Sequence, residues 1–218
     1  MSFIFAPSDA KIPRTARKIH IRRLYDVMNV SIQRNDLERA TRAWCILARC
    51  KEINWTAMWS TSVHLLANHL EERQRAEQKI AFLRVMMLQS SSERETILKE
   101  LILRLVISGQ HREALDELEL YLPSFPYQDN ALLHIYAGLI TLYLAQPSSQ
   151  GSPFNTTFLR NARGFFDRAK TLDSGNETIA AFLQKIDQLD GTRAKSADDS
   201  DEDIMDTSGA PERKRIRN

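Results

Sequence analysis

Hydrophobic residues in this chain recur at every third or fourth position, which is the spacing of an amphipathic α-helix and not of a strand. Within residues 35–50, Asn35 followed by Glu38 fits an N-cap with its capping-box partner. A second apolar stripe on residues 24–31 precedes it, so we predict a pair of helices joined by a tight turn. The apolar stripe of the second helix consists of Leu37, Ala40, Trp44 and Leu47.

The same arrangement recurs along the chain: a small residue, a large apolar residue four positions later, and an apolar or small residue after three more. It begins at Ala40, Ala76, Ala114 and Ala162, spaced by 36, 38 and 48 residues, whereas a tetratricopeptide repeat has about 34. The longest interval contains a Pro-, Ser- and Gly-rich segment at 145–157, which fits an inserted loop. The residues expected to pack the repeats together are Ala40, Trp44, Ala114, Leu118, Ala162 and Phe166.

These patterns predict an all-α fold: a degenerate, tetratricopeptide-like solenoid of helical hairpins with a C-terminal capping helix and a disordered tail. The predicted domains are a basic N-terminal lead-in (1–17), a helical repeat domain (18–190) and an acidic and basic tail (191–218). We expect hairpins at 18–50, 57–89, 94–122 and 129–172, and the capping helix at 176–190. The inward face of that last helix should carry Ile179, Phe182, Leu183 and Ile186.

From Gly191 onward large hydrophobic residues are scarce, so this segment cannot offset the entropy of its own ordering, and we expect it to be disordered. It contains an acidic block at 198–203 and ends in a basic cluster. That cluster fits the short basic patterns bound by nuclear import receptors; a solvated tail without this role is the alternative. The predicted import signal consists of Arg213, Lys214, Arg215 and Arg217.

The formal charge of the 218 residues is +2, so any case for nucleic-acid binding depends on local clusters and not on the net charge. Residues 11–23 carry six cations and no acid, an arrangement that could neutralise phosphates. A solvated lead-in to the first helix is the alternative interpretation. The candidate contacts to a DNA backbone are Lys11, Arg14, Arg17, Lys18, Arg22 and Arg23.

No motif for enzyme chemistry is found: the sequence has no glycine-rich phosphate loop, no nucleophile elbow and no zinc-protease motif. Cys45 and Cys50, the two cysteines, are spaced too far apart for a metal-binding pair. We therefore predict no catalytic, cofactor-binding or metal-ligating residue, no cofactor and no small-molecule ligand. The longest apolar run, residues 131–145, is short of the ~20 residues of a membrane helix and predicts a buried helix instead.

Two stretches, residues 33–59 and 121–146, carry a more specific pattern. In the first, the residues are Arg39, Ala40, Arg42, Ala43, Trp44, Leu47, Arg49 and Trp59. In the second, they are Tyr121, Leu122, Pro123, Pro126, Tyr127, Asp129, Asn130, Tyr136, Ala137 and Gly138. Both stretches resemble the tetratricopeptide subunit of the RNA polymerase I core factor, a fungal family that corresponds to a TBP-associated subunit of the animal selectivity factor.

The resemblance implies a non-catalytic scaffold subunit that acts in the nucleus and nucleolus, in the initiation of ribosomal RNA transcription. It implies a complex of this chain with a β-propeller subunit and a TFIIB-like subunit. The complex binds the ribosomal DNA core promoter, contacts TBP and recruits RNA polymerase I, and the contact of this chain with the DNA can be direct or indirect. Candidate interface aromatics are Phe125, Tyr127 and Phe154. The alternatives are a half-tetratricopeptide scaffold in nuclear RNA processing and a co-chaperone that grips a peptide carboxylate.

Overall fold

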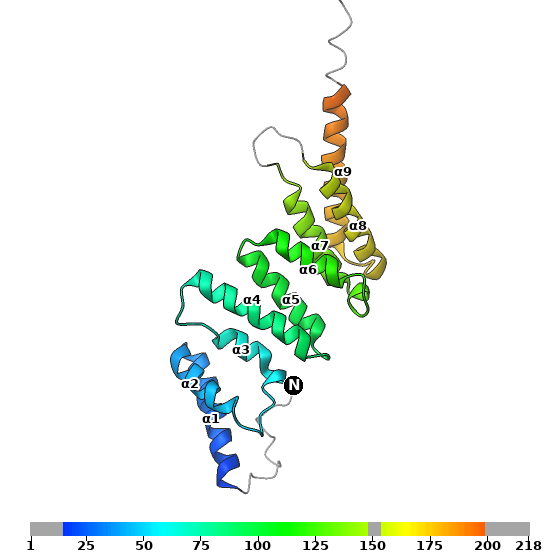
Figure 1. Cartoon of the computed structure of the whole chain (residues 1–218). Helices are drawn as coiled ribbons and strands as arrows, with labels where there is room; N and C mark the ends of the chain where they lie inside the picture. Colours follow the sequence, from blue (N-terminus) through cyan, green and yellow to red (C-terminus); the bar gives the residue numbers. More distant parts are fainter. Residues whose placement is uncertain (1–14, 148–153, 199–218) are drawn as a thin grey trace, which may run out of the picture. The chain divides into compact units, whose positions relative to one another are not determined.

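The computed structural model describes residues 15–147 and 154–198, and side chains as far as residue 190. Over these residues the backbone forms α-helices and two short 3-10 helices, without a strand, so the predicted all-α class is confirmed there (Figure 1). In chain order the elements are α1 (Ala16–Gln33), α2 (Leu37–Leu47), η1 (Thr56–Met58), α3 (Trp59–Leu65), α4 (Glu72–Gln89), α5 (Arg94–Ile107), α6 (His111–Tyr121), η2 (Tyr127–Asp129), α7 (Ala131–Leu144), α8 (Thr156–Leu172) and α9 (Glu177–Asp198).

The backbone contacts divide the chain into two compact units, Met1–Glu117 and Leu118–Asn218. The division falls inside α6. The first unit contains α1 to α5 and most of α6, and the second contains the end of α6 and α7 to α9.

The first unit begins with α1 and α2, which pack side by side and are joined by a three-residue turn (Figure 1). Asn35 closes this turn in the left-handed conformation, with φ of 59°, which asparagine tolerates better than most residues. The N-cap of α2 is therefore Asp36, whose Oδ1 accepts a hydrogen bond from the Arg39 amide at 3.1 Å. The N-cap predicted at Asn35 is wrong by one residue, and Glu38 instead pairs with Arg42.

The core of this helix pair surrounds Trp44, which is 8% exposed. Ala40 and Leu47 lie on the same face of α2 and are fully buried against Met28 of α1. Leu65 of α3 joins the same cluster. The apolar stripe that the sequence pattern predicts is thus the inner face of α2.

The first helix of the second predicted hairpin is short. This helix, α3, ends at Leu65 because the chain becomes extended at Leu66 and left-handed at Ala67, where φ is 60°. Trp59, at the start of α3, is buried. Ala76, which begins the second repeat pattern, is only half-buried on α4, whereas Ile80 is buried.

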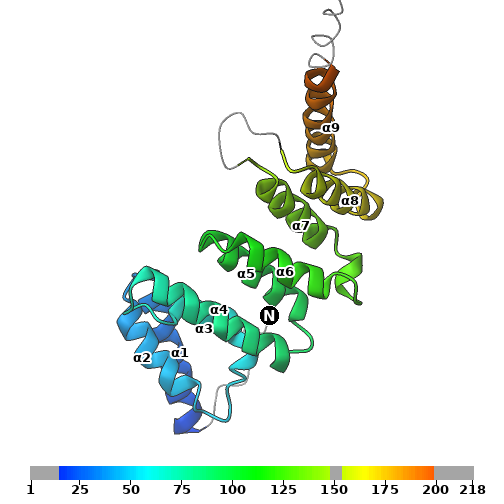
Figure 2. The same cartoon turned by 45° about the horizontal axis from the view of Figure 1, so that its top comes forward.

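Among α3 to α6, the most extensive contact is between α4 and α5 (Figure 2). The sequence pattern assigned these two helices to different hairpins, so the predicted pairing is wrong here. Arg84 links α4 to α6: its Nη2 donates to Glu113 Oε1 at 2.6 Å and its Nε to Glu117 Oε1 at 3.0 Å. These hydrogen bonds raise the pKa of the Arg84 guanidinium. Ala114, between the two glutamates on α6, is fully buried.

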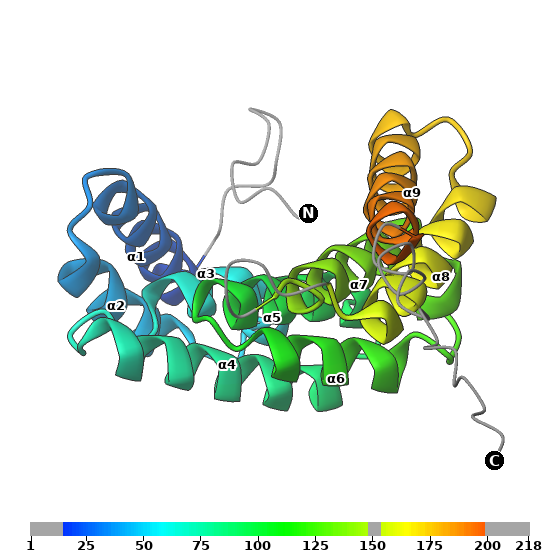
Figure 3. The ribbon, with the colours of Figure 1, turned by 90° about the horizontal axis from the view of Figure 1, so that it is seen from above.

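In the second unit, α7 and α8 make the closest contact, and α9 lies alongside α8 (Figure 3). A Cβ atom at Gly138 of α7 would lie 2.9 Å from the Phe166 ring of α8, so glycine permits this approach. Phe166 is fully buried and stacks on Phe182 of α9, with ring centroids 5.5 Å apart. Ile179 and Ile186 of α9 complete the cluster, as predicted for the inward face of this helix.

Residues 131–144 form α7, the core helix predicted from the apolar run. Its buried polar groups bond to the backbone: Thr141 Oγ1 donates to the Ala137 carbonyl at 2.7 Å, and His134 Nε2 lies 3.0 Å from the Gln128 carbonyl. Among the described residues, no helix is both long and apolar enough to cross a membrane.

α9 continues to Asp198, eight residues past the boundary at which we expected disorder to begin. An established helix adds residues at little cost, and Arg193, Ala194 and Lys195 are good helix formers. Residues 199–218 lie outside the described part of the chain.

The contact between Gly138 and Phe166 makes a testable prediction. Gly138→Ala should destabilise the fold by about 1–3 kcal/mol, because the added methyl group overlaps a buried ring that cannot withdraw. The matched control is Gly164→Ala on α8, where a Cβ meets no atom within 4 Å. That change should stabilise the helix by about 0.5–1 kcal/mol. Urea unfolding measures both, and equal effects of the two substitutions would contradict the close packing.

Candidate interaction surfaces

The structure describes four of the six predicted DNA-backbone contacts. Arg17, Lys18, Arg22 and Arg23 lie on the first two turns of α1. Lys11, Arg14 and the predicted import residues Arg213, Lys214, Arg215 and Arg217 lie outside the described residues.

Arg17 is engaged within the chain. Its Nε and Nη2 donate to the two carboxylate oxygens of Glu52 at 2.6 and 3.2 Å, a fork geometry that ties the start of α1 to the segment after α2. The hydrogen bond from Arg17 is the largest cause that lowers the pKa of the Glu52 carboxyl, and the same contact raises the pKa of the Arg17 guanidinium. Arg17 therefore has less capacity for a phosphate than its sequence position suggests.

The other described cations of this stretch do not form one stripe. Lys18 and Arg22 are four residues apart and share a helical face, whereas Arg23 is turned about 100° from Arg22. Arg22 is half-buried, and Lys18 and Arg23 are exposed. The structure thus brings together two of the predicted contacts and separates the others.

The position of these cations opposes the helix dipole. The first turn of α1 carries no acid, and positive charge near a helix N-terminus is unfavourable by a few tenths of a kcal/mol up to about 1 kcal/mol for each charge. Thr15 caps the helix instead, by accepting a hydrogen bond from the Lys18 amide at 3.4 Å. Local stability does not explain why basic residues occupy this turn.

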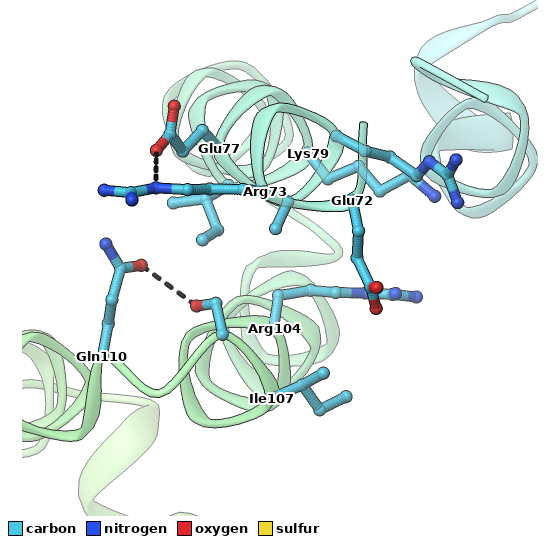
Figure 4. A pocket seen from close by; sticks show the side chains of 11 residues that line it. Glu72, Arg73, Glu77, Lys79, Arg104, Ile107 and Gln110 are labelled. Atoms are coloured by element: carbon cyan, nitrogen blue, oxygen red, sulfur yellow. Dashed lines mark hydrogen bonds and ion pairs between the residues drawn. The ribbon is translucent and has the colours of Figure 1, made fainter. Parts of the chain in front are cut away.

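A second charged surface was not predicted from the sequence. An open groove of about 660 Å³ runs along the N-terminal half of α4 and the C-terminal end of α5 (Figure 4). Its walls include Ala76 and Ile80 of α4 and Ile107 at the end of α5. Its charged lining residues are Glu72, Arg73, Arg75, Glu77, Lys79 and Arg104.

Lys79 is the unusual residue of this groove, because its side chain is only 8% exposed. It forms no ion pair or hydrogen bond with the described residues. Burial is the largest cause that lowers the pKa of its ammonium, followed by repulsion from Arg104 and Arg75; attraction to Glu100 opposes these effects only in part. The stem of Lys79 is thus buried, and its partly desolvated ammonium has no counter-ion among the described residues.

The two arginines beside Lys79 are held by other groups. Arg75 donates from Nη2 to the carbonyls of Leu70 at 2.9 Å and Asn68 at 3.4 Å, which fixes the turn before α4. The Nε of Arg75 is buried and has no hydrogen-bond partner in the described structure. Arg104 pairs with Glu100 one turn away at 2.7 Å.

The three candidate interface aromatics differ in exposure. Phe125 is 76% exposed, as an interface residue should be. Tyr127 is buried and packs on Tyr121, with ring centroids 5.4 Å apart, so the prediction that it lies at an interface is wrong. Phe154 is half-buried. The aromatic pattern alone could not separate these cases, because burial of Tyr127 depends on how the short helix η2 folds back.

Within the described residues, no group of three or more His, Cys, Asp or Glu side chains could hold a metal ion. Cys45 and Cys50 are free thiols. The fold and its surfaces define an all-helical protein of packed helix pairs, with charged open grooves on its surface.

Comparison with known proteins gives the family. The family model of the RNA polymerase I-specific transcription initiation factor Rrn11 matches residues 4–151, which is more than half of the chain. The chain belongs to this family of RNA polymerase I initiation factors. A relative from Schizosaccharomyces pombe, the RNA polymerase I-specific transcription initiation factor rrn11, is 28% identical over 167 residues, which cover 72% of this chain and 83% of that protein. No solved structure matches the chain.

The burial of Lys79 predicts that its removal stabilises the free protein. Lys79→Met keeps the apolar stem and removes the partly desolvated charge, so the free energy of unfolding should rise by a few tenths of a kcal/mol and at most by about 1 kcal/mol. The unfolded chain binds more protons than the folded one between the lowered pKa of Lys79 and its ordinary value of 10.5. As the pH rises through that window, the free energy of unfolding of the wild type should therefore increase relative to that of Lys79→Met.

Lys99→Met, on α5 and outside the groove, is the matched control for this measurement. It should change the free energy of unfolding by less than about 0.5 kcal/mol. A loss of stability in Lys79→Met, measured by urea unfolding at pH 7, would contradict the uncompensated burial of the ammonium.

Proposed function

We propose that this chain is a non-catalytic scaffold subunit of the RNA polymerase I core factor, which helps to assemble the initiation complex at the ribosomal DNA promoter. The observation that carries the proposal is the family match over residues 4–151, which covers α1 to α7. The helix-pair architecture supports a scaffold, because stacked hairpins present extended surfaces to partners.

The proposed architecture is a degenerate tetratricopeptide-like solenoid closed by α9. Two of the predicted hairpins, α1 with α2 and α7 with α8, coincide with closely packed helix pairs, and a small residue is buried near a large ring in Ala40 with Trp44, Gly138 with Phe166 and Ala162 with Phe166. The six residues proposed to pack the repeats are all buried: Ala40, Trp44, Ala114, Leu118, Ala162 and Phe166.

The proposed partners follow from the resemblance to the core-factor subunit: a β-propeller subunit, a TFIIB-like subunit, TBP and RNA polymerase I. Exposed apolar side chains at Phe125, Leu120 and Ile107 support protein contacts, since each is more than two-thirds exposed.

Contact with promoter DNA is proposed as a secondary role of the N-terminal basic stretch. Lys18 and Arg22 share a face and support a short, salt-sensitive contact to phosphates that does not depend on base sequence. Lys11, Arg14 and Arg23 extend the same stretch, whereas Arg17 is paired with Glu52. Two aligned cations support a modest contribution, so the other subunits are proposed to supply most of the DNA affinity.

The proposed site of action is the nucleus and the nucleolus, where RNA polymerase I transcribes ribosomal DNA. The basic residues Arg213, Lys214, Arg215 and Arg217 are proposed as the import signal.

Depletion of the protein from cells tests the proposed function. Synthesis of the ribosomal RNA precursor should stop, whereas messenger RNA synthesis should continue at first, because only RNA polymerase I depends on this factor. Chromatin crosslinking should place the protein at the ribosomal DNA promoter. Crosslinking to pre-messenger RNA together with splicing or polyadenylation factors would instead support a scaffold in nuclear RNA processing and contradict the proposal.

A further inference from the structure

The groove between α4 and α5 lacks a partner for its innermost charge. Lys79 is more than nine-tenths buried, lines the groove and forms no ion pair with the described residues. Figure 4 shows its side chain on α4, on the same helix as Arg73 and Glu77 and above Arg104 of α5. Its ammonium keeps contact with solvent, but burial lowers its pKa, so the free chain holds a partly desolvated charge without a counter-ion at this position.

The surroundings of Lys79 are built to favour an incoming anion. Arg75 and Arg104 both repel its ammonium, and the buried Nε of Arg75 is a second donor without an acceptor. Glu100 pairs with Arg104 through Oε1 at 2.7 Å and forms no ion pair with Lys79. The Lys79 ammonium is therefore the donor that an incoming carboxylate can reach, whereas the Arg75 Nε–H is fully buried.

The rim of the groove restricts the kind of anion that fits. Arg73 at the rim is already paired with Glu77 at 3.4 Å, and Glu72 adds a second carboxylate (Figure 4). A nucleic-acid backbone carries closely spaced phosphates, and these rim carboxylates would repel it. A single carboxylate has no further negative group of its own beside it. The rim carboxylates therefore repel it less than they repel a phosphate backbone, and it can reach Lys79.

The apolar wall points to a peptide rather than a free acid. Ala76, Ile80 and the 75% exposed Ile107 line the groove together with the charged residues. A volume of about 660 Å³ accommodates several side chains. This combination suits an acidic residue flanked by apolar neighbours in a protein segment.

We propose that this groove binds an Asp or Glu side chain of a partner subunit, with the carboxylate paired to Lys79 and the neighbouring residues of the partner packed on Ile80 and Ile107. This inference rests on the proposed scaffold function and names the chemistry of one partner contact. In the bound state, the carboxylate of the partner supplies the counter-charge that the described residues do not supply.

Zero-length crosslinking tests this contact in the native assembly. A carbodiimide joins an amine to a carboxylate only when the two groups touch, so treatment of the complex isolated through the tagged full chain should link Lys79 to an Asp or Glu of another subunit. Mass spectrometry identifies both residues of the link. A Lys79 that is linked only to Glu72, Glu77 or Glu100, or to nothing, overturns the inference.

A synthetic peptide that spans the crosslinked carboxylate then measures the contact directly. Lys79→Met should weaken its binding roughly tenfold or more, whereas Lys79→Arg should retain most of the affinity and Lys99→Met all of it. The same peptide with Asn or Gln in place of the acid should lose affinity for the wild type. Because Lys79→Met is expected to be at least as stable as the wild type, misfolding does not account for lost binding; unchanged binding overturns the inference.

The two proposals fail in different ways. If initiation-factor subunits co-purify with the chain but Lys79 forms no link to them or to any other protein, the scaffold function stands and the groove inference fails. If Lys79 is linked to a carboxylate of a protein outside RNA polymerase I initiation, the groove chemistry stands and the proposed function fails.

Discussion

Most of the described helices are apolar along one face and α7 is apolar around most of its surface, so they need neighbours that approach closely. The approach is set by small residues opposite large rings. Gly138 admits the ring of Phe166 at a distance that no Cβ would allow, and Phe166 in turn stacks on Phe182. The packing of α7, α8 and α9 in the second unit depends on this contact; in the first unit, Ala40 and Trp44 lie one turn apart on the inner face of α2 and are buried with Met28 of α1.

Much of this packing could be predicted from the sequence, because helical periodicity and the spacing of alanines are visible in it. Local turn chemistry was less accessible: the N-cap of α2 lies at Asp36 and not at Asn35, because the residue before the cap adopts a left-handed conformation. The early end of α3 at Leu65 has the same kind of cause in Ala67. Both depend on single backbone angles that no periodic pattern encodes.

The charged surfaces were the least predictable feature, because they depend on residues far apart in sequence. Arg17 looked like a free cation in a basic stretch, but Glu52, 35 residues away, binds it. Lys79 looked like one more polar residue in a charged helix, and only the approach of α5 buries it. Lys79 lies three residues before Phe82 and four before Leu83, which places it on the inward side of α4. This spacing was the one signal in the sequence for its burial.

The protein thus combines a fold stabilised by close apolar packing with charges placed against local electrostatic preference, at the start of α1 and in the groove of α4 and α5. Sites that break local rules without a structural gain are candidates for function. For an RNA polymerase I initiation factor, such charges are suited to partners that arrive after folding: phosphates at the first site and a carboxylate at the second. We propose that the first site faces DNA and the second a protein partner.

The central claim is that this chain acts in promoter-specific initiation and not in RNA synthesis itself. The most direct measurement compares two templates in an extract depleted of the protein. One carries the ribosomal DNA promoter, and the other has a single-stranded tail from which RNA polymerase I starts without a promoter. We predict that depletion abolishes transcription from the promoter template alone and that the purified full-length chain, added with its co-depleted subunits, restores it. Equal loss on both templates, or no loss on the promoter template, would contradict the account.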